Sequence, residues 1–125
     1  MKRECRLNDS DMLAEGLFPL QEVFNSIRDK AFIKTIRPLC HGTGFGVEFG
    51  ACTLPGDLDD YDKVMYGSLY GIEFGLHDGQ SVVVDYQIFY YYLKKACEAY
   101  VRSHPKDKDE IKSIIDEVKA QLGVD

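Results

Sequence analysis

The sequence predicts an α+β fold in which helices at both ends of the chain pack on a central antiparallel sheet. Residues 19–40 and 86–122 repeat apolar side chains with the period of an α-helix, whereas residues 45–53 and 72–84 alternate with the period of a strand. Strands that are grouped together and joined by a hairpin favour antiparallel pairing. The length suits one domain, which we expect to span residues 1–125.

The N-terminal third is expected to form a pair of helices. Pro19 opens the first, because proline is tolerated in the first turn of a helix. Asp29 is expected to cap the second, and Pro38 leaves the end of that helix open. The two predicted buried faces are Leu20, Val23, Phe24 and Ile27, and then Phe32, Ile36, Leu39 and Cys40.

The middle of the chain reads as strands. Four glycines between residues 42 and 50 disfavour a helix there, while Phe45, Val47 and Phe49 alternate with other residues. Residues 51–53 either extend this strand or begin its neighbour. Further on, Ile72, Phe74 and Leu76 point to one side of a strand and Glu73 to the other. Residues 77–80 contain an Asp-Gly pair and are expected to turn the chain into the strand 81–84.

The C-terminal third is expected to form a second pair of helices. Asp85 is suited to cap the first of them, and His104-Pro105 breaks it. Pro105 then opens the last helix and Gly123 ends it. The two apolar faces are Phe89, Leu93, Ala96 and Tyr100, and then Ile111, Ile114, Ile115, Val118 and Leu122.

Three consecutive tyrosines, Tyr90, Tyr91 and Tyr92, cover most of the circumference of the helix that holds them. All three cannot enter one core, so at least one ring should face a groove, a sheet edge or solvent. They either pack between the two C-terminal helices or contribute to a binding surface.

Negative charge is concentrated in the middle of the chain. Residues 50–90 hold seven acids and one base, a net charge of −6 that equals the charge of the whole chain. Such a region repels nucleic acid and anionic membranes, and it attracts a basic protein surface. With no apolar run of about 20 residues and no apolar leader, we expect a cytoplasmic protein that binds neither nucleic acid nor membrane.

Two motifs suggest ligand sites but depart from the patterns that such sites need. The cluster Gly42-Thr43-Gly44-Phe45-Gly46 has Val47 where a dinucleotide loop requires glycine. The acidic loop 57–62 has the carboxylates of a calcium or regulatory site, but Tyr61, Asp62 and Ser68 do not match an EF-hand. We therefore expect no cofactor and no specific metal, with an acidic metal-binding module as an open alternative.

The cysteines permit a further alternative. Cys5, Cys40, Cys52 and Cys97 are scattered, and in a reducing compartment they are expected to remain free thiols. A small enzyme that uses Cys40, His41 or Cys52 is conceivable only if the fold brings these groups together. We expect a protein without enzymatic activity.

Ordered short motifs in the last two-thirds of the chain carry a family resemblance. They begin with Gly-x-Gly-Phe-Gly-x-x-x-Gly-x-Cys-x-x-Pro from Gly42 to Pro55 and end with His104-Pro105-x-Asp107-Lys108. Between them lie Asp59-Asp60-Tyr61, Gly71-Ile72-Glu73-Phe74, Val82-Val83-Val84-Asp85-Tyr86 and Phe89-Tyr90-x-Tyr92-Leu93-x-x-Ala96-Cys97-x-x-Tyr100. The set resembles the immunity proteins of bacterial contact-dependent growth inhibition systems, within a group that neutralises ribonuclease toxins.

The resemblance implies a cytoplasmic inhibitor that binds the basic nuclease domain of a cognate toxin, in a complex expected to be 1:1. The acidic middle of the chain is compatible with this role, because an RNA-binding cleft is basic. The carboxylates would pair with lysines and arginines of the toxin, and a tyrosine would pack among them. The expected contact residues are Asp57, Asp59, Asp60, Tyr61, Asp62, Glu73 and Asp78.

Overall fold

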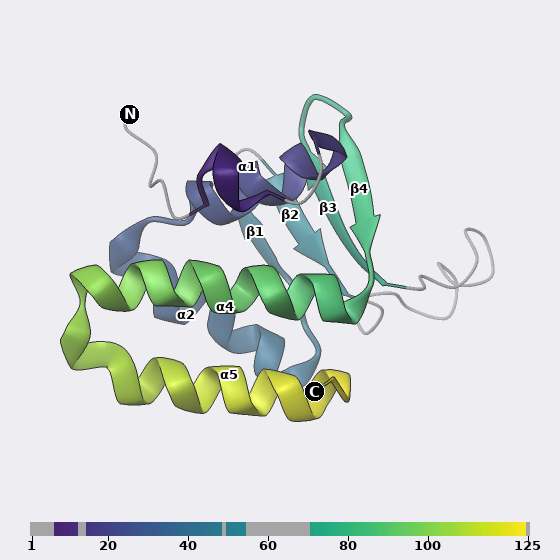
Figure 1. The fold of residues 1–125 in the computed structure, drawn as a ribbon. Helices are drawn as coiled ribbons and strands as arrows, with labels where there is room; N and C mark the ends of the chain where they lie inside the picture. The colour runs from purple at the N-terminus through teal and green to yellow at the C-terminus, as the bar shows by residue number, and fades with distance from the viewer. Residues whose placement is uncertain (1–6, 13–14, 49, 55–70, 125) are drawn as a thin grey trace.

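An antiparallel sheet with helices on one face forms the centre of the computed structural model, which describes residues 7–12, 15–48, 50–54 and 71–124 (Figure 1). Its strands lie in the order β1-β2-β3-β4, and each pairs antiparallel with the next. The predicted α+β class is confirmed, and residues 51–53 belong to a separate strand. The strands are β1 (Phe45–Val47), β2 (Gly50–Thr53), β3 (Ile72–Leu76) and β4 (Ser81–Val84).

The predicted helices are present at both ends of the sheet region. They are α1 (Phe18–Ser26), α2 (Phe32–Ile36), α4 (Tyr86–Ser103) and α5 (Lys108–Leu122). Short 3-10 helices precede or extend them at Asp9–Asp11, Glu15–Leu17, Asp29–Ala31, Arg37–His41 and Pro105–Asp107. Pro105 thus opens a 3-10 turn that leads into α5, in place of the first turn of the helix itself.

The second helix differs from its prediction at both ends. Asp29 lies inside the 3-10 helix Asp29–Ala31, and neither that helix nor α2 has a side-chain cap. Its carboxylate instead faces His104, with 4.0 Å between Oδ2 and Nε2. α2 ends at Ile36, shortly before Pro38, which has no amide hydrogen to continue the helix. The chain continues as the 3-10 helix Arg37–His41, which ends at Gly42. The φ of 76° at Gly42 lets the backbone change direction toward β1.

The core forms where α1 crosses the sheet, and Phe24 lies at its centre. The Phe24 ring is fully buried, with its centroid 6.2 Å from that of Phe45 on β1 and 5.5 Å from that of Phe74 on β3. Phe89 on α4 completes the cluster, 6.2 Å from Phe24 and 5.9 Å from Phe74. One aromatic cluster therefore joins α1, the sheet and α4.

The two C-terminal helices are linked to the N-terminal half through a stack of rings. Tyr100 on α4 stacks on Phe32 of α2, with centroids 4.6 Å apart, and on His104, with centroids 4.3 Å apart. The Tyr100 hydroxyl donates to Asp107 at 2.7 Å, which holds the start of α5 against α4. α5 also packs on the 3-10 helix 37–41, where Arg37 forms an ion pair with Glu110. Figure 1 shows α5 lying beside α4, away from the sheet.

Two buried amides anchor the first described residues to α1. The Asn25 side chain accepts a hydrogen bond from the Leu7 amide at 2.9 Å and donates to the Leu7 carbonyl at 3.0 Å. Gln21 donates to the same carbonyl at 3.1 Å. Because these bonds satisfy both backbone groups of Leu7, its side chain can enter the core, where it is 1% exposed.

The Asp85 cap provides a test of the fold. Its carboxylate accepts a hydrogen bond from the Ile88 amide at 2.8 Å, as the sequence predicts. We expect Asp85→Ala to lower the free energy of unfolding by about 1 kcal/mol and the melting temperature by roughly 3–5 °C. Asp85→Asn keeps an equivalent acceptor and should melt close to the wild type. Equal melting temperatures for all three proteins would show that the cap does not stabilise α4.

Candidate partner-binding surface

The face of the sheet opposite the core is uncovered by any described helix (Figure 1). Thr53, Glu73 and Val83 lie side by side across this face, because Glu73 is the register partner of both of the others. Val83 is 50% exposed, although it is large and apolar. A second row, of small residues, crosses the strands beside them: Gly46, Ala51, Gly75 and Ser81.

Glu73 is the one charged side chain among the described residues of these two rows. It projects from β3, an inner strand whose backbone pairs with β2 on one side and β4 on the other. It forms no ion pair with any residue that the structure describes. The fold thus holds this carboxylate on a rigid strand, without a cation partner among the described residues.

Asp78 has a different environment. It lies in the exposed turn between β3 and β4, where it accepts hydrogen bonds from the Gln80 amide at 3.0 Å and from the Gln80 side chain at 2.7 Å. Both bonds lower the pKa of the Asp78 carboxyl below its usual value, and the bond from the Gln80 backbone amide has the larger effect. Asp78 is therefore charged at neutral pH and at the same time stabilises the predicted hairpin turn.

The structure places Glu73 and Asp78 toward opposite ends of the hairpin. Four residues separate them, and the part of this span that belongs to β3, from Glu73 to Leu76, corresponds to about 10 Å of extended strand. Glu73 lies at the end of the sheet where the described chain stops at Leu54 and resumes at Gly71. The other expected contact residues, Asp57, Asp59, Asp60, Tyr61 and Asp62, lie outside the described residues.

Comparison with known proteins identifies the family. The family model described as CDI immunity protein matches residues 14–115, from the residues before α1 to the middle of α5. The chain belongs to this family. A search of the curated proteins found no match.

Membership confirms the resemblance seen in the sequence and defines the general role. CDI stands for contact-dependent growth inhibition, and an immunity protein of such a system binds a cognate toxin protein and neutralises it. The sheet face that no described helix covers, and its carboxylate, thus belong to a protein whose family role is to bind another protein. None of the helices in the described ranges is long and apolar enough to cross a bilayer.

The thiols of this CDI immunity protein do not form a reactive centre among the residues described. Cys40, Cys52 and Cys97 form no disulfide with one another, and Cys52 and Cys97 are buried. Cys52 points into the core face of β2, whereas His41 is exposed at the end of a 3-10 helix. Burial, followed by a hydrogen bond with Glu117, raises the pKa of the Cys40 thiol to about 11. A nucleophilic cysteine requires the opposite shift.

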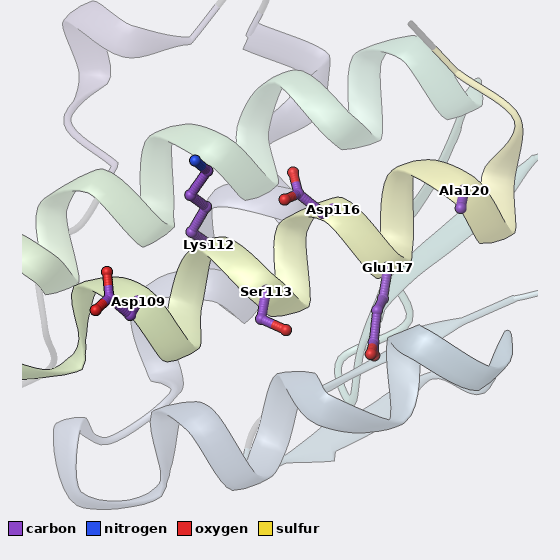
Figure 2. Close-up of a pocket in the computed structure, with 6 residues that line it drawn as sticks. All are labelled: Asp109, Lys112, Ser113, Asp116, Glu117 and Ala120. Atoms are coloured by element: carbon purple, nitrogen blue, oxygen red, sulfur yellow. The ribbon is translucent and has the colours of Figure 1, made fainter.

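The glycine cluster and the helix surfaces of this CDI immunity protein also lack the parts of a ligand site. Residues 42–46 lead from a 3-10 helix into β1, which is followed by β2, whereas a phosphate loop leads directly into the N-terminus of a helix. Figure 2 shows a polar hollow on α5 whose lining includes Ser113 and Glu117 but no histidine or cysteine. In the described part of the chain, no three metal-binding side chains cluster. The acidic loop 57–62 lies outside that part.

The tyrosine prediction is confirmed. Tyr90 and Tyr92 are buried, whereas Tyr91 is 37% exposed and has Lys95 over its ring, 5.3 Å from the centroid.

The exposed Val83 was not predicted, because a valine in the run 81–84 gives no sign in the sequence of which face it occupies. The alternating strand pattern around Glu73 is the signal that could have located it, through the β3–β4 register.

The raised pKa of Cys40 predicts low reactivity. The Cys40 Sγ atom lies 3.8 Å from the Ile114 carbonyl oxygen. Only the protonated thiol can donate to this oxygen, so the contact favours the thiol over the thiolate. With a pKa raised from 9.0 to about 11, the native thiol should react with iodoacetamide roughly 100-fold more slowly at pH 8 than in the urea-unfolded chain. Timed alkylation with peptide mapping measures this ratio at Cys40 separately from the other cysteines.

The same shift sets a pH dependence. Because folding raises this pKa, the contribution of the thiol to stability is complete below pH 9 and is lost as the pH rises toward 11. Native alkylation within about threefold of the unfolded rate would contradict the assignment and would reopen the case for a reactive cysteine.

Proposed function

We propose that this CDI immunity protein neutralises a ribonuclease toxin by placing its acidic surface over the basic RNA-binding cleft of the toxin. The observation that supports this most directly is the position of Glu73, a carboxylate on an inner strand that forms no ion pair with a described residue and projects from a sheet face that no described helix covers. Family membership indicates that the partner is a toxin protein. The negative charge of the chain supports a contact between carboxylates of this protein and cations of the toxin.

Electrostatic attraction explains how an acidic inhibitor reaches such a target. A ribonuclease must present lysines and arginines to phosphates, so its cleft has a positive potential. Carboxylates on the inhibitor mimic that phosphate charge, which accelerates encounter and disfavours partners of the wrong sign. The net charge of −6, all of it accounted for by residues 50–90, gives this chain the required field.

The sheet scaffold makes Glu73 suitable as a central contact. Since β3 is bonded on both sides, the carboxylate is presented with little backbone entropy left to lose on binding. Val83 beside it provides exposed apolar surface that a partner protein can bury. Leu54 and Gly71, the described residues that flank 55–70 in the chain, both lie at this end of the sheet. We therefore propose that the Asp57–Asp62 carboxylates take part in the same contact as Glu73.

The complex that we propose is 1:1 and is formed by residues 1–125 acting as one domain in the cytoplasm. Its interface should bury roughly 1,600 Å² in total, the standard size for protective inhibitors. Asp78, at the far end of the hairpin, would then lie at the rim of the interface, where a charge affects encounter more than it affects dissociation.

Neutralising the acidic residues tests the proposal as a whole. We expect Asp57→Asn/Asp59→Asn/Asp60→Asn/Asp62→Asn to weaken binding of the cognate toxin domain, with each desolvated carboxylate worth roughly 2–5 kcal/mol. Surface plasmon resonance at two salt concentrations measures the affinity and its salt dependence. Asp109→Asn/Asp116→Asn on α5 is the control and should bind as the wild type does. Unchanged affinity of the fourfold variant at low salt would contradict the proposed contact.

A cation placed beside Glu73 tests the sheet face separately. In Val83→Lys the new ammonium lies directly across from Glu73 and can neutralise it, so toxin affinity should fall at least tenfold while the melting temperature stays within a few degrees. Val83→Thr keeps the β-branched shape without a charge and should bind within about threefold of the wild type. Equal affinities for both variants would remove Glu73 from the interface.

A further inference from the structure

A second surface of the molecule has the opposite charge from the sheet face. A groove of about 450 Å³ runs between α4 and α5, and its lining is mainly apolar. Cys97 and Val101 of α4 and Ile111 and Ile115 of α5 form its floor. Cys97 and Ile111 are buried, whereas Val101 and Ile115 remain partly exposed. The groove therefore offers apolar surface that no described residue covers.

Cations border this floor. Arg102, Lys108 and Lys112 line the groove against a single acid, Glu98, which gives the site a net positive charge in a chain whose total is −6. None of these three cations forms an ion pair with a residue in the described ranges. In Figure 2 the Lys112 side chain extends from α5 toward α4. Apolar floor and unpaired cations thus occupy the same groove.

From this combination we infer that the α4–α5 groove binds an acidic amphipathic helix of a partner protein. Two packed helices leave between them a channel that accepts a third helix, whose apolar residues at positions i, i+3, i+4 and i+7 fill the floor. Acidic residues beside those anchors meet the cations on the two walls. The groove is not part of the proposed toxin contact, because its charge would repel a basic cleft.

The size of the groove sets the strength of the contact. On α5 the lining extends from Lys108 to Ile115, which corresponds to about 11 Å, or two turns of a bound helix. A contact of that length buries far less than a standard interface, so the complex is transient and its affinity lies in the range of roughly 10–500 μM. Attraction between exposed charges makes this affinity fall with added salt.

A designed peptide provides the probe. It is acetylated and amidated, about 14 residues long, with leucines at i, i+3, i+4 and i+7, glutamates beside them and alanine elsewhere. A second peptide has lysine in place of every glutamate. Titration into the isotope-labelled full-length protein, followed by NMR, should shift the amide resonances of Val101, Ile111 and Ile115 with the acidic peptide only.

Charge reversal in the protein makes the test specific. The variant Arg102→Glu/Lys112→Glu should bind the acidic peptide with an affinity at least tenfold lower than that of the wild type. It should bind the lysine peptide with a higher affinity than the wild type does. Lys30→Glu/Lys34→Glu changes the net charge by the same amount at exposed positions outside the groove and should bind within about twofold of the wild type. If Arg102→Glu/Lys112→Glu fails to fold, Arg102→Gln/Lys112→Gln replaces it with the same expected direction.

Two results would overturn the inference. One is the absence of groove shifts with the acidic peptide up to about 1 mM at low salt, which would mean that the lysine and arginine stems only shelter the floor from water. The other is equal weakening by the groove variant and its control, which would mean that net charge and not the groove attracts the peptide. Toxin affinity is measured on the same variants and should be unchanged, so the two binding surfaces are judged independently.

Discussion

The packing of Phe24 is the interaction on which the rest of the structure depends. This one ring, fully buried, lies against aromatic rings from β1, β3 and α4. Burying such a side chain supplies several kilocalories per mole, and it does so at a point where α1, the sheet and α4 meet in one aromatic cluster. The orientation of the sheet relative to both helices follows from this contact.

Because that cluster fixes which face of the sheet is inside, it also fixes which face is outside. In a strand, neighbouring side chains point to opposite faces, so burial of Ile72 and Phe74 obliges Glu73 to point away from the core. A shift of one residue in the β2–β3 register would reverse this arrangement and bury a charge. The stability of the core and the availability of the Glu73 carboxylate therefore have the same cause.

The molecule has two surfaces of different charge. Acids dominate the middle of the chain, whereas the groove between α4 and α5 is lined by three cations and one acid. The two surfaces belong to different layers, since α5 packs on α4 and on the 3-10 helix 37–41 and not on the sheet face that carries Glu73. Under the two proposals made above, a basic toxin would bind one of these surfaces and an acidic helix the other.

The sequence specified most of the elements because their signals are local. The apolar period of α1, the Asp-Gly turn between β3 and β4 and the Asp85 cap of α4 each depend on residues a few positions apart, and each is found as predicted. Where a distant contact competes with a local signal, the local prediction is wrong. Asp29 has the side chain of a helix cap, yet it faces His104, which lies 75 positions further along the chain.

The sequence by itself determined the α+β class, the family resemblance and the sign of the charge, since composition, period and motif order are properties of the chain and need no third dimension. Tertiary structure alone decided that Val83 stands exposed beside Glu73 and that Arg102, Lys108 and Lys112 gather around one apolar groove. Such neighbours are set by strand register and helix packing, which bring together residues from different elements that no local pattern pairs directly.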